Sequence, residues 1–205
     1  MKADHIKPEE EEEVLDPFYT PDTRAQSFRL GVYSWLQPLV LALAVLIMLS
    51  TFVGRIIGVD GESMMPTLHD HDMLVLQSLG YKPAQGDIVV LTQRSFSDKP
   101  IVKRIIATGG QTVDVDYAAN TVTITDKDGS RHVLDEPYLG EPMRQPASLS
   151  NTHIEVPEGS ICVFGDNRNN STDSRFPSVG TVDERCVIGR AVLILLPFQR
   201  LGVIH

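Results

Sequence analysis

An uncharged, mostly apolar stretch from Leu30 to Gly54 is the feature that most limits how this 205-residue chain can fold. Its centre, Leu39 to Val53, reads LVLALAVLIMLSTFV. With Trp35 and Leu36 added, the stretch is long enough to cross about 30 Å of hydrocarbon as a helix. Pro38 would lie in the first turn of that helix, where its missing N–H costs little. The stretch therefore predicts one helix that spans a lipid bilayer.

Such a helix is either a retained anchor or a cleaved secretory signal. A secretory signal has a short basic segment before its apolar core and a small-residue cleavage site soon after it. Here the core begins far into the chain and follows an acidic segment, so we predict a retained transmembrane anchor over residues 30–55. Arg24 and Arg29 precede the anchor and Arg55 ends it. Because positive charge favours the cytoplasmic side, we expect a cytoplasmic N-terminus and an extracytoplasmic domain over residues 56–205.

The segment before the anchor, residues 1–29, carries a run of glutamates from Glu9 to Glu13. Adjacent like charges repel one another and bury nothing, so we predict a solvated, disordered cytoplasmic tail. An acidic docking tail is the alternative interpretation. The net charge of −9 over the whole chain gives no basis for a nucleic-acid partner, because phosphate binding needs a basic patch.

Beyond the anchor the pattern changes to short β-branched runs separated by turn residues. These runs are residues 72–76, 86–91, 121–125 and 160–164. Lys127-Asp128-Gly129-Ser130 is typical of a hairpin turn, and the run from Ala191 to Phe198 is too short to span a bilayer and predicts a buried strand. No long helical period follows Gly58. The expected fold class is mainly β: one N-terminal transmembrane helix, then an all-β catalytic domain, sandwich- or barrel-like, of about 150 residues, which is enough for its own core.

Neither the cysteines nor the histidines indicate a metal site. Cys162 and Cys186 are the only cysteines, and both lie in apolar runs, so we expect free thiols in the core; a disulfide in an oxidising compartment is the alternative. His69 and His71 alternate with aspartates in a polar loop, but further ligands at a recognisable spacing are missing. We therefore predict no metal and no cofactor.

Two segments carry residues suited to nucleophilic catalysis. Ser63 is followed by Met64, Met65 and Pro66, an unusual sequence for a plain turn, since long apolar side chains are normally buried. A loop whose two methionines pack into the core is the alternative interpretation. Lys103 lies within an apolar strand pattern. Burial lowers the pKa of a lysine from about 10.4 towards neutrality, and a neutral amine can take the proton of a serine hydroxyl. A lysine that extends from a strand edge into solvent is the alternative.

A third segment, Gly165 to Arg175, reads GDNRNNSTDSR. Its aspartates and arginines are spaced to form ion pairs and turn hydrogen bonds within a long loop. A solvated polar loop is the alternative. The segment also contains glycosylation sequons at Asn169 and Asn170, but a loop locked by buried charges would be a poor acceptor.

Five segments, in order, resemble those of the bacterial type I signal peptidases, a serine protease family that uses a lysine. They are SMMPTL at residues 63–68, GDIVVL at 86–91, VKRIIATGG at 102–110, LDEPYL at 134–139 and GDNRNNSTDSR at 165–175. The similarity runs from the apolar stretch to the C-terminus. Its short middle region resembles the compact, Gram-positive-like members, and Lys103 stands where endoplasmic-reticulum relatives have histidine.

The resemblance implies a membrane-bound serine endopeptidase of the bacterial cell membrane that removes N-terminal signal peptides from exported preproteins. Ser63 would be the nucleophile and Lys103 the general base. Ser171 would orient the lysine amine by a hydrogen bond, and Asp173 would hold the loop. Arg104, Asp166, Arg168 and Arg175 would form a structural ion network. The implied partners are signal peptides and the lipid bilayer, and the sequence does not determine the oligomeric state.

The resemblance also implies an oxyanion hole and a specificity. The backbone N–H of Ser63 would donate to the oxyanion; some members have a serine where this chain has Gly61, which leaves the second donor open. Four residues would line two shallow pockets: Ile57, Val59, Val90 and Val102. An extended substrate turns alternate side chains towards the enzyme, so small residues at the first and third positions before the cut, the Ala-x-Ala pattern, are expected.

Two other functions and one other catalytic arrangement are alternatives. A cytosolic self-cleaving repressor shares the serine–lysine chemistry, but it would have a DNA-binding helix-turn-helix and no membrane span. A triad would need one of the chain's 6 histidines beside Ser63. A membrane-tethered β domain that only binds a partner is the non-enzymatic alternative, and labelling of a reactive serine separates it from an enzyme.

Overall fold

The computed structural model describes residues 23–52, 55–92, 99–148 and 150–204, and within the helix it describes the side chains of residues 33–47. The acidic tail up to residue 22 lies outside the described residues, as do residues 53 and 54 of the predicted anchor. The chain divides into two units, Met1–Ile47 and Met48–His205.

Helix α1 extends over Thr23–Phe52, and Pro38 lies inside it. The prediction that Pro38 would occupy the first turn is therefore wrong. The helix begins at Thr23, and residues 24–37 contain no proline that would keep them from being helical. The described side chains of the helix, Tyr33 to Ile47, are all exposed. In the described part of the chain, no helical segment reaches both the length and the apolar character that a membrane span requires.

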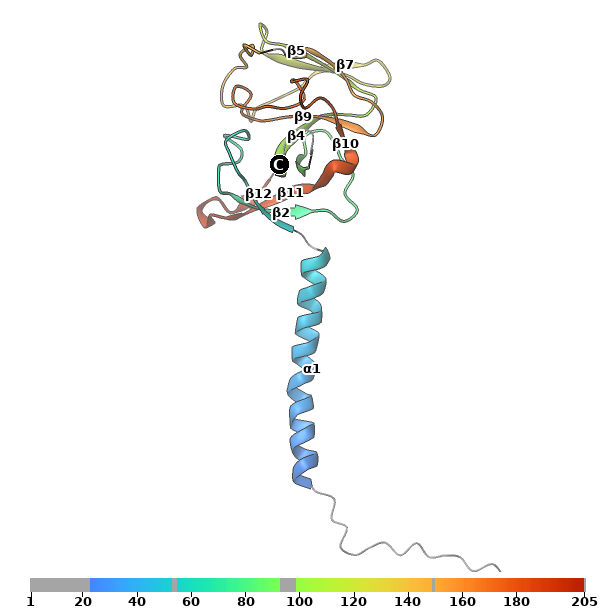
Figure 1. Cartoon of the computed structure of the whole chain (residues 1–205), viewed down its shortest axis with the longest axis vertical. Helices are drawn as coiled ribbons and strands as arrows, with labels where there is room; N and C mark the ends of the chain where they lie inside the picture. Colours follow the sequence, from blue (N-terminus) through green and yellow to red (C-terminus); the bar gives the residue numbers. More distant parts are fainter. Residues whose placement is uncertain (1–22, 53–54, 93–98, 149, 205) are drawn as a thin grey trace, which may run out of the picture. The chain divides into compact units, whose positions relative to one another are not determined.

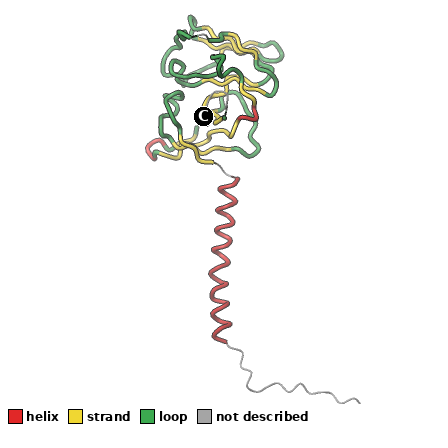
Figure 2. Tube along the Cα trace, viewed as in Figure 1, coloured by secondary structure: helices red, strands yellow, loops and turns green. Residues whose placement is uncertain are grey.

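The second unit is built from short strands. They are β1 (Arg55–Gly58), β2 (Met73–Gln77), β3 (Ile88–Leu91), β4 (Ile101–Thr108), β5 (Thr112–Asp116), β6 (Thr121–Thr125), β7 (Arg131–Val133), β8 (His153–Glu155), β9 (Ser160–Phe164), β10 (Val182–Asp183), β11 (Val187–Leu196) and β12 (Gly202–Val203). Two short 3₁₀ turns, η1 (Glu184–Cys186) and η2 (Phe198–Arg200), flank β11. Loops connect most of the strands (Figure 2). The mainly β class predicted for residues 56–205 is confirmed.

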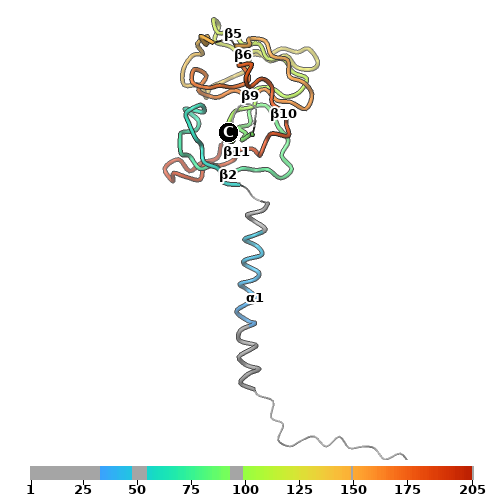
Figure 3. Tube along the Cα trace, in the orientation of Figure 1, coloured from blue at the N-terminus to red at the C-terminus, as the bar shows by residue number. Residues whose placement is uncertain are grey.

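The strands form two antiparallel sheets. The larger has the order β1-β2-β11-β3-β4-β9-β10, with β12 added beside β11, and the smaller has the order β7-β6-β5-β8. In Figure 1 the small sheet lies at the end of this unit farthest from β2, and β4 and β9 lie between. The chain crosses from the large sheet to the small one through β4 and β5, a passage that can be followed by colour in Figure 3.

Three apolar clusters fill the second unit. The first cluster consists of Val59, Met64, Leu68, Leu74, Leu76, Ile88, Val90, Val102, Ala191, Ile194 and Ile204. The second includes Ile106, Phe164, Val113 and Ile124 and joins the two sheets. The third covers the opposite side of β3 and β4 through Val89, Leu91 and Ile105. Alternate residues of β3 thus face different clusters, which fixes its register and that of its partner β4.

The runs predicted as strands are strands in the structure: β2, β3, β6 and β9 lie within or across them. The run at 191–198 forms the second half of β11, which begins earlier and ends at Leu196. The predicted hairpin turn is confirmed by the hydrogen bond from Asp126 N to Ser130 O at 2.8 Å. Cys162 and Cys186 are free, as expected, but only Cys162 is buried.

Candidate active site

Ser63 lies in the turn segment between β1 and β2. The segment is closed at its base by hydrogen bonds from Val59 N to Asp72 O (2.8 Å) and from His71 N to Val59 O (3.0 Å). Met64, next to the serine, is 1% exposed and belongs to the first apolar cluster. Burial of Met64 fixes the backbone beside Ser63, so the nucleophile candidate is held on a structured turn rather than on a free loop.

The turn itself depends on Gly61 and Asp70. Gly61 has a φ of 100°, a conformation in which a side chain is strained. Its N–H donates to Asp70 Oδ1 at 2.8 Å. Asp72 accepts from His69 N at 2.8 Å and pairs with Arg200 Nη1 at 3.0 Å. The aspartates of the histidine-containing loop thus support the turn that carries Ser63.

Lys103 lies in the middle of β4, where its Cα is paired with that of Val89 in β3. Its ammonium group donates to Ser63 Oγ at 2.6 Å. The fold therefore brings into contact two residues that the sequence separates by 40 positions. The interpretation of Lys103 as a lysine extending into solvent is wrong, because the residue is only 4% exposed.

The surroundings of Lys103 lower its pKa to about 8. Burial is the main cause, because an ammonium loses hydration in the protein interior, and Arg175 lowers the pKa further. The carboxylates of Asp173 and Asp166 act in the opposite direction. A substantial neutral fraction is therefore present at mildly alkaline pH, which is what a general base requires.

Asp173 is the centre of the loop over residues 165–175. Its carboxylate accepts from Ser171 Oγ at 2.7 Å and from Gly165 N at 3.0 Å. It also receives two bonds from the Arg175 guanidinium, at 2.8 Å from Nε and 2.9 Å from Nη2. Both members of the pair are fully buried, so the loop is locked by an ion pair out of contact with water.

Ser171 lies close to the turn segment that carries Ser63. A Cβ placed on Gly165 would lie 2.3 Å from Ser171 Oγ and 2.5 Å from Ser63 O. Since real contacts of a Cβ are essentially never shorter than 3.0 Å, only glycine at 165 lets Ser63 and Ser171 come this close together. The Ser171 hydroxyl donates to Asp173, and the bond expected between Ser171 and the lysine amine stays a prediction.

Two further ion pairs surround the site. Arg104 binds Asp166 through Nε at 2.9 Å and Nη2 at 2.8 Å, and Asp166 also accepts from Thr67 Oγ1 at 2.5 Å. Arg168 pairs with Glu136, with Nη1 3.1 Å from Oε2. The ion network expected from Arg104, Asp166, Arg168 and Arg175 is present, and Glu136 completes it. Charged partners of this kind are required because unpaired buried charges are strongly destabilising.

The residues predicted to line the substrate pockets lie together. Val59, Val90 and Val102 are buried in the first apolar cluster, and the half-buried Ile57 packs against it. Val90 is the β-sheet partner of Val102. The geometry is compatible with an apolar wall next to Ser63.

A comparison with known families decides the identity. The family model described as "Signal peptidase, peptidase S26" matches residues 32–196. The chain belongs to the signal peptidase family S26. Its enzyme class is that of signal peptidase I, a serine peptidase hydrolase that removes signal peptides.

Individual signal peptidases are similar over most of the chain. A probable signal peptidase I-1 from Synechocystis sp. is 34% identical over 174 residues, which cover 80% of this chain and 82% of the relative. A signal peptidase I from Leptolyngbya laminosa is 36% identical over 162 residues, or 74% and 73% of the two chains. The crystal structure of a signal peptidase I from Enterococcus faecalis V583 has 29% identity and a TM-score of 0.42, and it covers 54% of this chain and 97% of that one.

Sequence reasoning missed the part played by Asn167 in this signal peptidase fold. Its backbone N–H donates to Ser63 O at 3.0 Å, and its side-chain amide donates to Glu62 O at 3.2 Å. Asn170 reaches the carboxylate of Glu62 at 3.4 Å. The loop over 165–175 therefore holds the serine segment directly. The amides in GDNRNNS were a signal for this, because asparagine commonly bonds backbone groups.

Proposed function

We propose that this signal peptidase is a membrane-bound serine endopeptidase in which Ser63 attacks the scissile carbonyl and Lys103 acts as the general base. One observation carries the proposal: the 2.6 Å contact between Lys103 Nζ and Ser63 Oγ, made by a buried lysine whose pKa is lowered to about 8. The cut releases the signal peptide from an exported preprotein.

The chemistry follows from the charge states of the two groups. Neutral Lys103 takes the hydroxyl proton as Ser63 Oγ bonds to the carbonyl carbon, which gives a tetrahedral oxyanion and an ammonium. The ammonium returns the proton to the leaving amine as the C–N bond breaks and an acyl-enzyme forms. Neutral Lys103 then deprotonates the water that attacks the ester, and the Ser63 hydroxyl is restored.

The oxyanion requires hydrogen-bond donors aimed at the developing charge. Within the described ranges, the N–H of Ser63 donates to no protein acceptor, so it is available for this role. Gly61 N is occupied by Asp70, and the second donor therefore has to come from another group or from a change at that turn on binding. Ser171 and Asp173 support the base by shaping its surroundings.

Specificity for small residues is supported by the valines beside the dyad. Strand β1 ends the large sheet, so its outer edge can pair with an extended substrate. The side chains of Ile57, Val59, Val90 and Val102 would then face the first and third substrate residues before the cut. A methyl group fits such β-branched walls, whereas a larger side chain forces repacking at a cost of about 1–3 kcal/mol.

Membrane attachment is supported by the exposed apolar helix. Leu39, Leu41 and Leu46 are each more than 60% exposed, and exposed apolar surface of this extent is typical of a segment covered by lipid or by a partner. A bilayer anchor over residues 30–55, with the catalytic domain outside the bacterial cell membrane, places the protease next to emerging preproteins. Protease added to intact spheroplasts should then digest residues beyond Arg55 and spare the tail; digestion of the tail would invert this topology.

The dyad is tested with purified full-length protein in detergent and one preprotein. Ser63→Ala and Lys103→Ala should each lower the cleavage rate by about 10⁴-fold or more, because the residues of a catalytic unit fail together. Lys127→Ala, which removes an exposed lysine paired with Glu158, is the matched control and should cleave normally. Cleavage by Lys103→Ala at a near wild-type rate would contradict the mechanism.

The pockets are tested with substrates that carry Ala, Ser, Leu or Phe at the first position before the cut. Ala and Ser should be cleaved well, and Phe should lose about 10- to 100-fold in kcat/KM, as a repacking cost of 1–3 kcal/mol implies. Equal turnover of Ala and Phe would show that these four residues do not form the pocket.

A further inference from the structure

A cavity of about 190 Å³ lies next to the serine segment. It is lined by Met65, Pro66, Gly140, Glu141, Asp166 and Asn167. None of these residues belongs to the apolar cluster that contains Val59, Val90 and Val102. The two methionines after Ser63 separate the two sides: Met64 is buried in that cluster, whereas Met65 lines the cavity.

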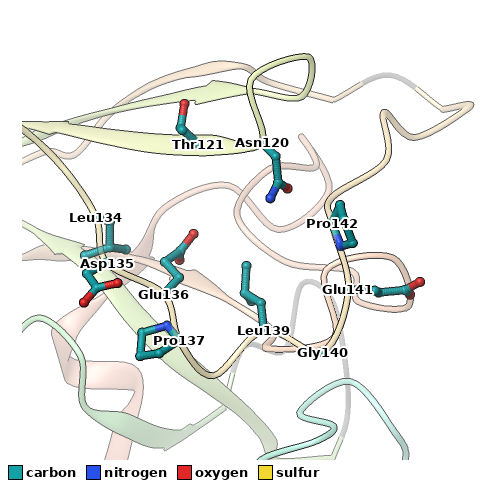
Figure 4. Close-up of a pocket in the computed structure, with 10 residues that line it drawn as sticks. All are labelled: Asn120, Thr121, Leu134, Asp135, Glu136, Pro137, Leu139, Gly140, Glu141 and Pro142. Atoms are coloured by element: carbon teal, nitrogen blue, oxygen red, sulfur yellow. The ribbon is translucent and has the colours of Figure 1, made fainter.

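This cavity adjoins a larger one. Gly140 and Glu141 also line a cavity of about 410 Å³ between the start of β6 and the segment over residues 134–142. In Figure 4 the side chains of Asn120 and Leu139 point towards one another across it, and the Glu136 side chain points into the same space. Its volume falls within the range of roughly 300–1,000 Å³ typical of ligand sites. The two cavities share Gly140 and Glu141 in their linings, and we call them together the leaving-side groove.

The direction of the peptide decides which part of a substrate reaches this groove. If the residues before the cut occupy the wall made by Val59, Val90 and Val102, the residues after the cut have to leave Ser63 on another side. The leaving-side groove begins at Asn167, whose N–H bonds to Ser63 O at 3.0 Å. An extended chain advances about 3.3 Å per residue, so a cavity lined by Met65 and Asn167 is near enough to Ser63 to receive the first residues after the cut.

The charges on the groove are of one sign. Among the described residues, no lysine or arginine lines either cavity, whereas Asp135, Glu136, Glu141 and Asp166 do. Asp166 is neutralised by Arg104 in a buried ion pair. Glu136 is neutralised by Arg168 in a buried ion pair. Among the described residues, Glu141 pairs with Arg144 at 3.3 Å, and both side chains are exposed, so this pair neutralises the carboxylate only weakly. A basic group in the groove would therefore gain a carboxylate, and an acidic group would be repelled.

We propose that the leaving-side groove binds the first residues of the mature protein, downstream of the cut, and that Glu141 makes these positions favour basic over acidic side chains. The inference rests on the proposed function of Ser63 and Lys103. It assigns a second substrate region to the enzyme, distinct from the small-residue pockets, and identifies Glu141 and Gly140 as its specificity determinants.

The test uses full-length protein and substrates that are identical before the cut and carry Lys, Gln or Glu at the first and second positions after it. Wild type should prefer Lys to Glu by about 5-fold in kcat/KM, the effect of one exposed charge pair. Glu141→Lys should abolish or reverse that ratio. Glu155→Lys makes the same charge change on β8, outside both cavities, and should keep the wild-type ratio.

A second variant tests the shape of the groove. A side chain on Gly140 would start 3.4 Å from Pro66 Cδ, so Gly140→Leu should narrow the cavity and lower kcat/KM more for a large residue after the cut than for glycine there. An unchanged Lys-to-Glu ratio in Glu141→Lys, or equal losses for both residue sizes in Gly140→Leu, would overturn the groove assignment. Failure of wild type to cleave any of the substrates would instead count against the proposed function.

Discussion

Two aspartate–arginine pairs with the same spacing lie in very different places in this molecule. Arg175 binds Asp173 at 2.8 and 2.9 Å, and both side chains are 0% exposed. Arg185 binds Asp183 at 2.9 and 2.6 Å, with side chains 90% and 39% exposed. In both pairs the backbone N–H of the arginine also donates to the aspartate. The local geometry is nearly the same, and burial is the difference.

Burial changes what each pair can do. A buried charge left without its partner is strongly destabilising, whereas exposed pairs are screened by water and contribute little. The buried pair also organises the site, because Asp173 accepts from Gly165 N and from Ser171 and raises the pKa of Lys103. The exposed pair touches none of these groups. The same two-residue motif is therefore a structural element of the candidate active site in one place and a surface feature in the other.

The largest expected effect comes from removing one member of the buried pair. Arg175→Ala leaves Asp173 buried without its cation and should lower the free energy of unfolding by about 3–5 kcal/mol. Arg185→Ala, the matched control, should unfold at the wild-type denaturant concentration. Urea unfolding followed by circular dichroism measures both. Equal effects of the two substitutions would mean that burial does not distinguish the pairs.

A smaller effect on stability, but a large one on activity, is expected from Gly165→Ala. The new methyl group would overlap Ser63 O and Ser171 Oγ, so the serine segment and the loop over residues 165–175 have to shift relative to one another. The cleavage rate should fall at least about 10-fold, because catalysis is sensitive to displacements of 1 Å. Gly202→Ala in β12, where the nearest atom is 3.7 Å away, is the control and should retain activity. A fully active Gly165→Ala variant would show that close packing at this glycine is not required.

The smallest expected effect on activity is a shift in its pH dependence. Wild-type kcat should rise as the pH increases through about 8, because Lys103 acts as a base only when it is neutral. The carboxylate of Asp173 stabilises the ammonium form of Lys103. Asp173→Asn should therefore lower the pKa of Lys103 and move the rising part of the pH profile, here called its limb, to lower pH. Asp183→Asn should leave the limb in place. A profile measured from pH 6 to 10 on folded protein checks both, and a limb that moves upward in Asp173→Asn would contradict the electrostatic assignment.

The residues of the candidate site differ in how well the sequence predicted them. Ser63, Lys103, Ser171 and Asp173 were identified from segments whose order resembles one family, since catalytic chemistry restricts residue types strongly. The sequence did not predict that Asn167 bonds the segment that carries Ser63 or that Glu136 pairs with Arg168. Each polar residue of a loop has many groups to which it can bond. The positions of the two methionines could not be predicted from the sequence either. Met64 lies in the core, as the alternative interpretation of this segment had it, but Met65 lines a cavity.

The sequence by itself determined the mainly β class, the positions of most strands and the membership in the signal peptidase family, and it selected Ser63 and Lys103 as the residues proposed to carry the reaction. These follow from local β-branched periodicity and from short segments in a fixed order. Only the tertiary structure decided that Lys103 is buried against Ser63 and that Asp173 is buried whereas Asp183 is exposed to solvent. It also decided that Gly140 comes close to Pro66 beside the candidate active site. The physical reason is that desolvation, which sets the pKa of a lysine and the strength of an ion pair, depends on neighbours far away in the chain.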